Sequence, residues 1–138
     1  WNVADTTNPE GGAVRQPDIE IYLRDDHVAD LLDWLHKVMG PLTLDEPKGL
    51  TQHGALHADQ TIPLMVVRKA AGKWASIWFD SDVTPWESDR DCARAVHAAL
   101  GHEVRCSVGG WEEADGEADA DRWLKINADG EHEFLWAQ

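Results

Sequence analysis

The spacing of apolar residues predicts a strand and an amphipathic helix early in the chain. Residues 19–23 alternate between apolar and polar side chains, as in a strand with one buried face. Asp25 or Asp26 then stands at the N-cap of a helix that Gly40 and Pro41 end. The apolar side of this helix has the three- and four-residue spacing of one helix face: Val28, Leu31, Leu32, Leu35, Val38 and Met39.

The same patterns predict the remaining elements. Residues 41–60 contain two prolines and two glycines and indicate a connection with room for one short strand. Residues 62–68 and 74–80 predict a hairpin. Ser88 caps a second helix that ends at Gly101. Three further strands are predicted at 104–108, 123–127 and 131–136, the last two joined as a hairpin through Asp129-Gly130.

This order predicts an α+β protein of the ferredoxin-like kind. The split β-α-β pattern (βαββαβ) places two helices on one face of an antiparallel sheet, here with an added C-terminal β-hairpin. The polar residues 1–17 are expected to form a loose N-terminal segment, and residues 18–138 a single domain. No apolar run approaches the roughly 20 residues of a membrane helix, so no membrane span is expected.

The net charge of the chain excludes one class of function. The chain has 26 acidic and 12 basic residues and a net charge of −14, which excludes a free-standing nucleic-acid binder because such proteins neutralise phosphates with Lys and Arg. A stretch without a single base carries six of the acids: Glu112, Glu113, Asp115, Glu117, Asp119 and Asp121. This stretch is either a solvated loop or a patch that docks a basic partner. A calcium loop is a weaker alternative because the EF-hand spacing is not met. An overall halophilic adaptation would also explain the acidity.

Eight tryptophans are many for a chain of 138 residues. In the predicted sheet Tyr22, Trp74 and Trp78 share the face that the helices leave open. These rings either pack beneath the C-terminal hairpin with partners such as Phe134 and Trp136, or form an interface with a partner protein or a second copy of the chain. Trp111 adds an aromatic residue beside the acidic stretch.

Histidines and cysteines provide candidate chemistry. His53 and His57 are four residues apart with Asp59 nearby, so a metal site or a small enzyme site in this segment is an alternative hypothesis. The glutamate that follows the first histidine of a zinc protease is absent, because residue 54 is Gly. Cys92 and Cys106 both fall on predicted core positions, and whether they are bonded stays open. No cofactor motif is present, and two cysteines favour a reduced, cytoplasmic location.

Together these patterns predict a small acidic, non-enzymatic binding protein of the immunity or inhibitor kind. It would neutralise a basic protein partner such as a toxin or a nuclease, with the six acids steering association. Trp111, Trp74, Trp78 and Tyr22 would serve as aromatic anchors. Because the chain begins at Trp1, whether a leader or neighbouring domain was removed stays open, and an accessory domain of a larger assembly is a third interpretation.

Overall fold

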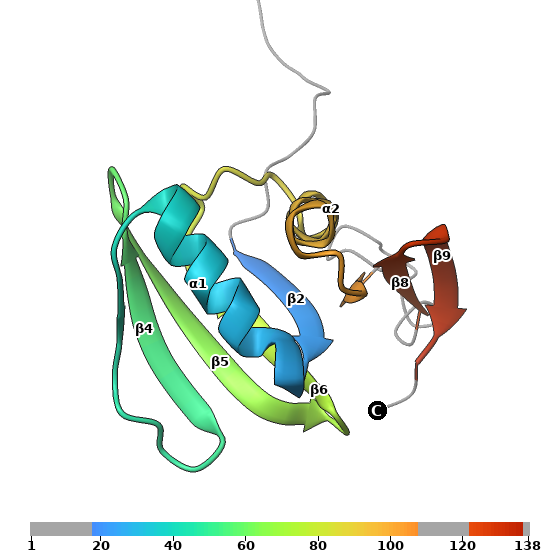
Figure 1. Ribbon diagram of the computed structural model, residues 1–138, viewed down its shortest axis with the longest axis horizontal. Coiled ribbons are helices and arrows are strands. Elements are labelled where there is room, and N and C mark those ends of the chain that lie inside the picture. The colour runs from blue at the N-terminus through green and yellow to red at the C-terminus, as the bar shows by residue number, and fades with distance from the viewer. Residues whose placement is uncertain (1–17, 108–121, 137–138) are drawn as a thin grey trace, which may run out of the picture.

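The described residues form one eight-stranded antiparallel sheet and two α-helices, an α+β fold (Figure 1). This computed structural model describes residues 18–107 and 122–136. The elements are β2 (Ile19–Arg24), η1 (Asp25–His27), α1 (Val28–Met39), β3 (Leu42–Leu44), β4 (Thr51–His57), β5 (Thr61–Ala71), β6 (Trp74–Phe79), α2 (Asp89–Leu100), β7 (Val104–Ser107), β8 (Arg122–Asn127) and β9 (Gly130–Leu135). The strands lie in the order β3-β4-β5-β6-β2-β7-β8-β9. Neither described helix is long and apolar enough to cross a membrane.

Strand β2 lies inside the sheet, between β6 and β7. Its residues Ile19, Ile21 and Leu23 have no exposed surface, and they form one apolar cluster with the buried residues of α1 and α2. In Figure 1, α1 crosses in front of the sheet over β5 and β2. The alternation predicted for residues 19–23 is therefore confirmed, because this side of the strand is completely covered.

The start of α1 differs from the sequence prediction. Asp25 and Asp26 belong to the short 3-10 turn η1, and the residue before α1 is His27, whose side chain makes no capping bond. The Asp25 carboxylate instead accepts a hydrogen bond from the Lys69 amide at 3.0 Å. The Asp25 side chain therefore bonds to β5, which is distant in sequence, instead of capping α1. Rules for helix capping consider only neighbouring residues and do not include such a contact.

The segment 41–60 is more ordered than its composition suggested. It contains β3 and the seven-residue β4, which pairs with β5 along its whole length. Gly54 favoured a loop in the sequence, but in the structure close packing requires it. A Cβ at residue 54 would lie 2.7 Å from the backbone carbonyl oxygen of Thr43. Glycine in a strand often marks such a close backbone approach.

The second helix and the C-terminal hairpin follow the predictions closely. Ser88 Oγ accepts a hydrogen bond from the Asp91 amide at 3.2 Å, as an N-cap should. Gly101 ends α2 with a left-handed φ of 76°, and its amide bonds the His97 carbonyl at 2.8 Å. Strands β8 and β9 pair from Arg122↔Leu135 to Asn127↔Gly130.

Truncating the buried face of α1 tests this core. We expect Leu31→Ala to lower the free energy of unfolding by about 2–5 kcal/mol, because Leu31 has no exposed surface and the lost side chain leaves a cavity. The exposed neighbour Asp33 provides the control, since Asp33→Ala should change stability by no more than about 0.5 kcal/mol. Urea denaturation followed by circular dichroism measures both. Equal stabilities for the two variants would contradict the packing of α1.

Candidate functional site

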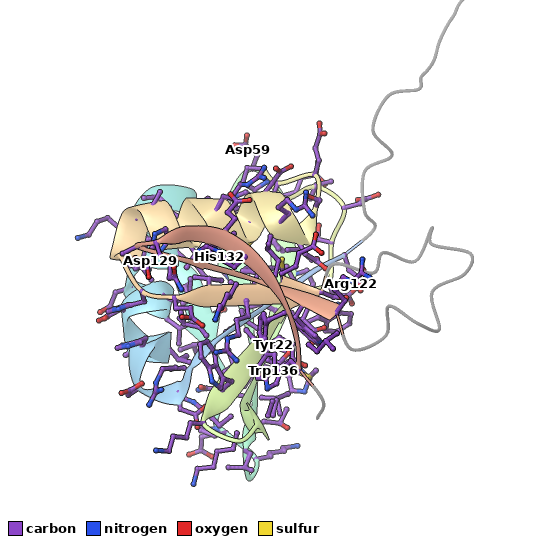
Figure 2. The ribbon with its side chains drawn as sticks, turned by 90° about the vertical axis from the view of Figure 1, so that its right-hand side faces the viewer. Tyr22, Asp59, Arg122, Asp129, His132 and Trp136 are labelled. Carbon is purple, nitrogen blue, oxygen red and sulfur yellow. The ribbon has the colours of Figure 1, made fainter. Side chains whose placement is uncertain are left out.

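An aromatic cluster covers Tyr22, on the side of β2 opposite Ile21 and Leu23. Its members come from β2, β6, β8, β9 and the residue that follows β9. We define the cluster as Tyr22, Trp74, Trp123, Phe134 and Trp136. Trp136 is central, with its ring centroid 5.1 Å from that of Trp123 and 5.5 Å from that of Tyr22 (Figure 2). Most of these pairs meet edge to face, an arrangement that aromatic quadrupoles favour.

Arg105 holds the aromatic cluster together. Its guanidinium carbon lies 4.0 Å from the Trp74 ring centroid, 4.6 Å from that of Trp136 and 4.7 Å from that of Phe134. A planar guanidinium stacks on aromatic faces in this way, whereas a lysine ammonium has no such plane. The register explains the placement, because Arg105 on β7 is directly opposite Tyr22 on β2.

The carboxylate of Glu103 forms an ion pair with the Arg105 guanidinium. This carboxylate accepts hydrogen bonds from Arg105 Nε at 2.8 Å and from Asn127 Nδ2 at 3.1 Å. Burial raises the pKa of Glu103, but these two bonds and the charge of Arg105 outweigh it and leave the pKa below its ordinary value. The cation among the rings therefore has a permanent counter-charge at neutral pH.

Packing beneath the C-terminal hairpin, one of the two hypotheses for the aromatic residues, is seen for part of the predicted set. Tyr22 is only 9% exposed because Trp123 and Trp136 cover it, so packing at the C-terminal hairpin is confirmed for Tyr22 and Trp74. Burial and the nearby charge of Glu20 raise the pKa of the Tyr22 phenol. Trp78 is half-buried and lies outside the cluster as defined, with its indole N–H donating to Asp18 Oδ2 at 2.7 Å. A partner could reach Tyr22 only if the hairpin moved.

Exposed carboxylates gather at one end of the sheet, which we call the acidic end. They come from the β4–β5 turn, the segment between β6 and α2, and the first turn of α2: Asp59, Asp80, Asp82, Glu87 and Asp91. The register places these segments together, since Phe79 pairs with both Ile19 and Leu64. Asp89, at the start of α2, accepts a hydrogen bond from the Glu20 amide at 2.9 Å, which ties the helix to the same end.

The predicted acidic stretch lies outside the described residues. Trp111, Glu112, Glu113, Asp115, Glu117, Asp119 and Asp121 all fall between Ser107, the last residue of β7, and Arg122, the first of β8. Strand β7 runs antiparallel to β2, so Ser107 and its partner Trp123 are at the end of the sheet where β2 begins. The described residues that flank the six acids are therefore at the acidic end.

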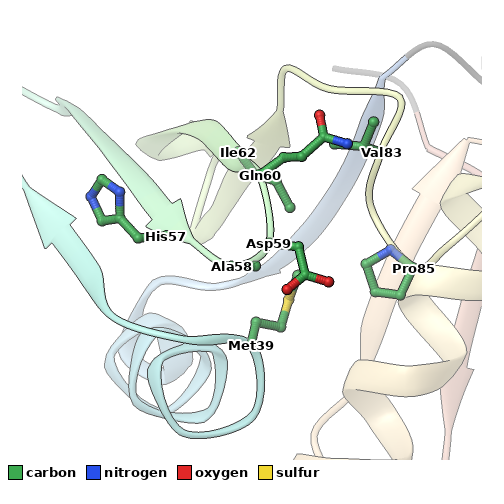
Figure 3. Close-up of a pocket in the computed structure, with 8 residues that line it drawn as sticks. All are labelled: Met39, His57, Ala58, Asp59, Gln60, Ile62, Val83 and Pro85. Atoms are coloured by element: carbon green, nitrogen blue, oxygen red, sulfur yellow. The ribbon is translucent and has the colours of Figure 1, made fainter.

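A hollow of about 650 Å³ opens beside these carboxylates (Figure 3). Met39, Ile62, Val83 and Pro85 give it apolar walls, and Asp59 projects between Met39 and Pro85. Gln60 and His57 also line the hollow, and apolar walls beside a carboxylate suit a side chain with an aliphatic stem and a cationic tip.

The three residues of the predicted metal segment are not gathered at one point. His57 and Asp59 both line the hollow, but the His57 imidazole points away from Asp59 and lies 3.0 Å from Thr43 Oγ1 (Figure 3). His53 is on the same strand four residues earlier, which is about 13 Å away at the usual rise. The i, i+4 spacing aligns ligands on a helix, and this segment is a strand.

Sequence reasoning missed a different group of ligand-type side chains. His27, Asp30 and His102 each present one donor atom within 4.8 Å of the others, the one such group of three among the described residues. The signal in the sequence was weak: His27 and Asp30 are one helical turn apart across a helix start, but His102 is 72 residues further along. Only the packing of α1 against α2 brings the three together.

The two cysteines are unsuited to nucleophilic chemistry. Both are free thiols in the core, and burial raises the pKa of Cys92 well above its ordinary value and that of Cys106 to about 12. A thiol becomes a nucleophile only as the thiolate, so at neutral pH both side chains act as small apolar residues.

No protein-family model matches this chain, and neither a curated protein nor a solved structure is significantly similar to it. Any functional conclusion therefore depends on the charges, the hollow and the side-chain clusters described above.

Removing the Arg105 guanidinium tests the aromatic cluster. We expect Arg105→Ala to lower the free energy of unfolding by about 1–3 kcal/mol, because three rings lose their cation and Glu103 loses a partner. Lys125→Ala is the matched control, since its ammonium lies over one ring of the cluster, 5.3 Å from the Phe134 centroid. Denaturation monitored by tryptophan fluorescence measures both. A loss for Lys125→Ala as large as that for Arg105→Ala would contradict the central role of Arg105.

The lowered pKa of Glu103 predicts a pH dependence of stability. A carboxylate whose pKa is lower in the folded state stabilises the protein above the unfolded pKa of about 4.3, and this contribution is lost as the pH falls through the folded pKa. Wild type should therefore be more stable than Glu103→Gln at pH 7, and the difference should shrink below pH 4. Urea midpoints at several pH values measure it. A difference that is constant with pH would show that Glu103 is not held ionised.

Proposed function

We propose that this chain is a small acidic, non-enzymatic binding protein that docks a basic protein partner, as immunity proteins and inhibitors of toxins or nucleases do. The observation that carries the proposal is the gathering of exposed Asp59, Asp80, Asp82, Glu87 and Asp91 at one end of the sheet. Ser107 and Arg122, which flank the six acids of 112–121, are at that same end. A concentrated negative surface raises the association rate with a positive partner by electrostatic steering.

The hollow supplies the second element of a docking surface. Charges that steer association raise the association rate but do little for the lifetime of the complex. Most of the binding energy usually comes from a few buried side chains. A lysine or arginine of the partner would lay its stem against Met39, Ile62 and Val83 and present its charge to Asp59. In this proposal the aromatic cluster has a structural role, since Tyr22 is covered by the hairpin, while Trp78 and Trp111 remain candidate anchors.

The proposal includes a fold and a location. The order β5-β6-β2-β7, with α1 after β2 and α2 after β6, supports a ferredoxin-like split β-α-β core to which β3–β4 and β8–β9 are added. Buried residues of both helices share one cluster with Ile19, Ile21 and Leu23, which supports both helices covering one face. The free thiols of Cys92 and Cys106 fit a reduced, cytoplasmic site of action.

Co-expression with the products of the adjacent genes, followed by purification at low and moderate salt, identifies the partner. We expect one basic protein to form a stable complex with this chain. If none of these products forms a complex at either salt concentration, the proposal is wrong.

Charge removal then tests the docking surface. The triple variant Asp80→Asn, Asp82→Asn, Glu87→Gln should slow association with that partner by about ten-fold at low salt and change dissociation less. Asp45→Asn, Glu46→Gln, Asp129→Asn removes the same charge from exposed positions away from the acidic end. Stopped-flow mixing measures both rates. Equal slowing by the two variants would mean that only net charge matters and that the acidic end is not the docking surface.

A further inference from the structure

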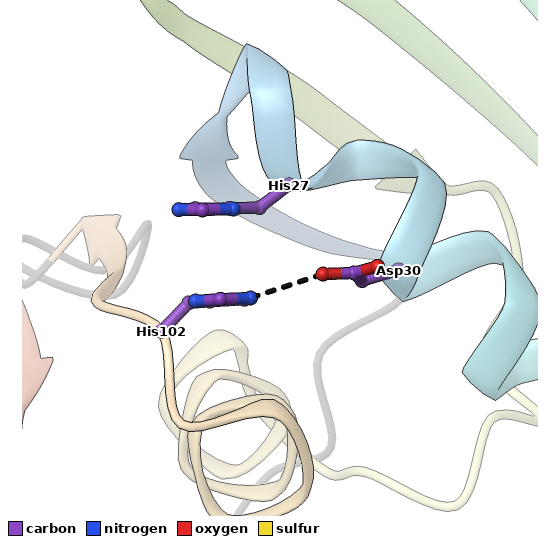
Figure 4. Close-up of side chains that lie close together, drawn as sticks. All are labelled: His27, Asp30 and His102. Atoms are coloured by element: carbon purple, nitrogen blue, oxygen red, sulfur yellow. Dashed lines mark hydrogen bonds and ion pairs between the residues drawn. The ribbon is translucent and has the colours of Figure 1, made fainter.

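The side chains of His27, Asp30 and His102 lie close together (Figure 4). His27 comes shortly after the last residue of β2, whereas the acidic end is where β2 begins. His27 ends η1, Asp30 is in the first turn of α1, and His102 lies between α2 and β7. The two imidazole rings are stacked, with centroids 3.6 Å apart and planes within 4° of parallel. His102 Nε2 lies 3.1 Å from Asp30 Oδ2.

The backbone holds these three residues in place. His27 and Asp30 are three positions apart across a helix start, which puts their side chains on the same side of the helix. The His102 carbonyl lies 2.8 Å from His97 Nδ1, and Gly101 fixes the turn before it through its bond to the His97 carbonyl. The positions of all three Cα atoms are thus set by secondary structure and its caps, while the side chains remain accessible.

From this geometry we propose that His27, Asp30 and His102 bind a divalent transition-metal ion of the zinc type. Two imidazole nitrogens and one carboxylate oxygen are a ligand set that suits Zn²⁺, and three protein ligands leave a fourth position for water. The side chains of His27 and His102 are 29% and 28% exposed, so an ion from solution can reach them. Asp26 adds negative charge, with Oδ1 4.0 Å from His27 Nε2.

Binding requires one local change. Nitrogen lone pairs lie in the plane of the imidazole ring, so two parallel rings cannot both aim at one ion. A turn of one ring about its Cβ–Cγ bond makes the lone pairs converge, and partial exposure leaves room for this turn. The ion would take the place of the hydrogen bond between His102 and Asp30, so the carboxylate would exchange the imidazole for a direct bond to the cation.

A bound ion would join the start of α1 to the connection between α2 and β7, two segments 72 residues apart in sequence. Any ligand that binds the folded state alone raises the thermal midpoint as its concentration rises. This inference is independent of the proposed partner-binding function, because it uses none of the residues of the acidic end.

Calorimetric titration of the tag-free full chain with ZnCl₂ tests the proposal. We expect one saturable site per chain and a thermal midpoint that rises with zinc. His27→Ala, His102→Ala and Asp30→Asn should each weaken zinc binding at least about ten-fold, the lower limit for disturbing a metal site. His53→Ala is the matched control, because His53 is an exposed histidine away from the cluster and should leave zinc binding unchanged.

A second measurement separates ligation from folding. In the folded wild-type protein, zinc should shift the imidazole NMR signals of His27 and His102 and leave those of His53 and His132 in place. The proposal is overturned if wild type shows no saturable zinc binding. It is equally overturned if His53→Ala weakens binding as much as His102→Ala, or if other imidazoles shift instead of these two.

Discussion

Strand β2 is buried along one face and, at Tyr22, on the other face as well, and much of the fold follows from these two requirements. On one face Ile19, Ile21 and Leu23 are covered by the cluster that includes both helices. On the other face Tyr22 needs a second cover, which Trp123 and Trp136 provide. An antiparallel sheet usually leaves one face to water. Here the C-terminal hairpin is part of the core, because without it Tyr22 and the surrounding rings would be exposed.

The aromatic cluster that covers Tyr22 has a charged side chain, Arg105, among its rings rather than an apolar one. Arg105 projects from β7 into the rings, and burying an unpaired cation would cost far more than the stacking returns. Glu103 and Asn127 remove that cost by completing a hydrogen-bonded network across β7 and β8. The network therefore fixes how β8 and β9 are placed against β7, and apolar contacts alone would allow several arrangements of these rings.

The sequence predicted elements whose determinants are local and missed features that depend on distant contacts. The apolar stripe of α1 from Val28 to Leu35, the Ser88 cap and the hairpin through Asp129-Gly130 depend on residues within a few positions, and all three were predicted. Val38, which the same spacing placed on the stripe, is instead 54% exposed. Residues 41–60 left room for one short strand, but two strands, β3 and β4, and their bounds were not predicted. The residues of β4 lack a clear alternation, and the strand exists through pairing with β5. The group of His27, Asp30 and His102 was missed for the same reason, since no sequence spacing relates residue 102 to residue 27.

The two ends of β2 lead to surfaces of different chemistry. At its start Asp89 accepts a hydrogen bond from the Glu20 amide, and the exposed carboxylates of the acidic end lie around it, among them Asp91, which is 3.8 Å from Arg94. At its other end Arg24 forms an ion pair with Asp26 at 3.7 Å, and His102 Nε2 lies 3.1 Å from Asp30 Oδ2. Six strand residues span about 20 Å, more than twice the Debye length of about 8 Å at physiological salt. A metal ion at His27 would therefore leave the field at the acidic end almost unchanged, and the two surfaces can act independently.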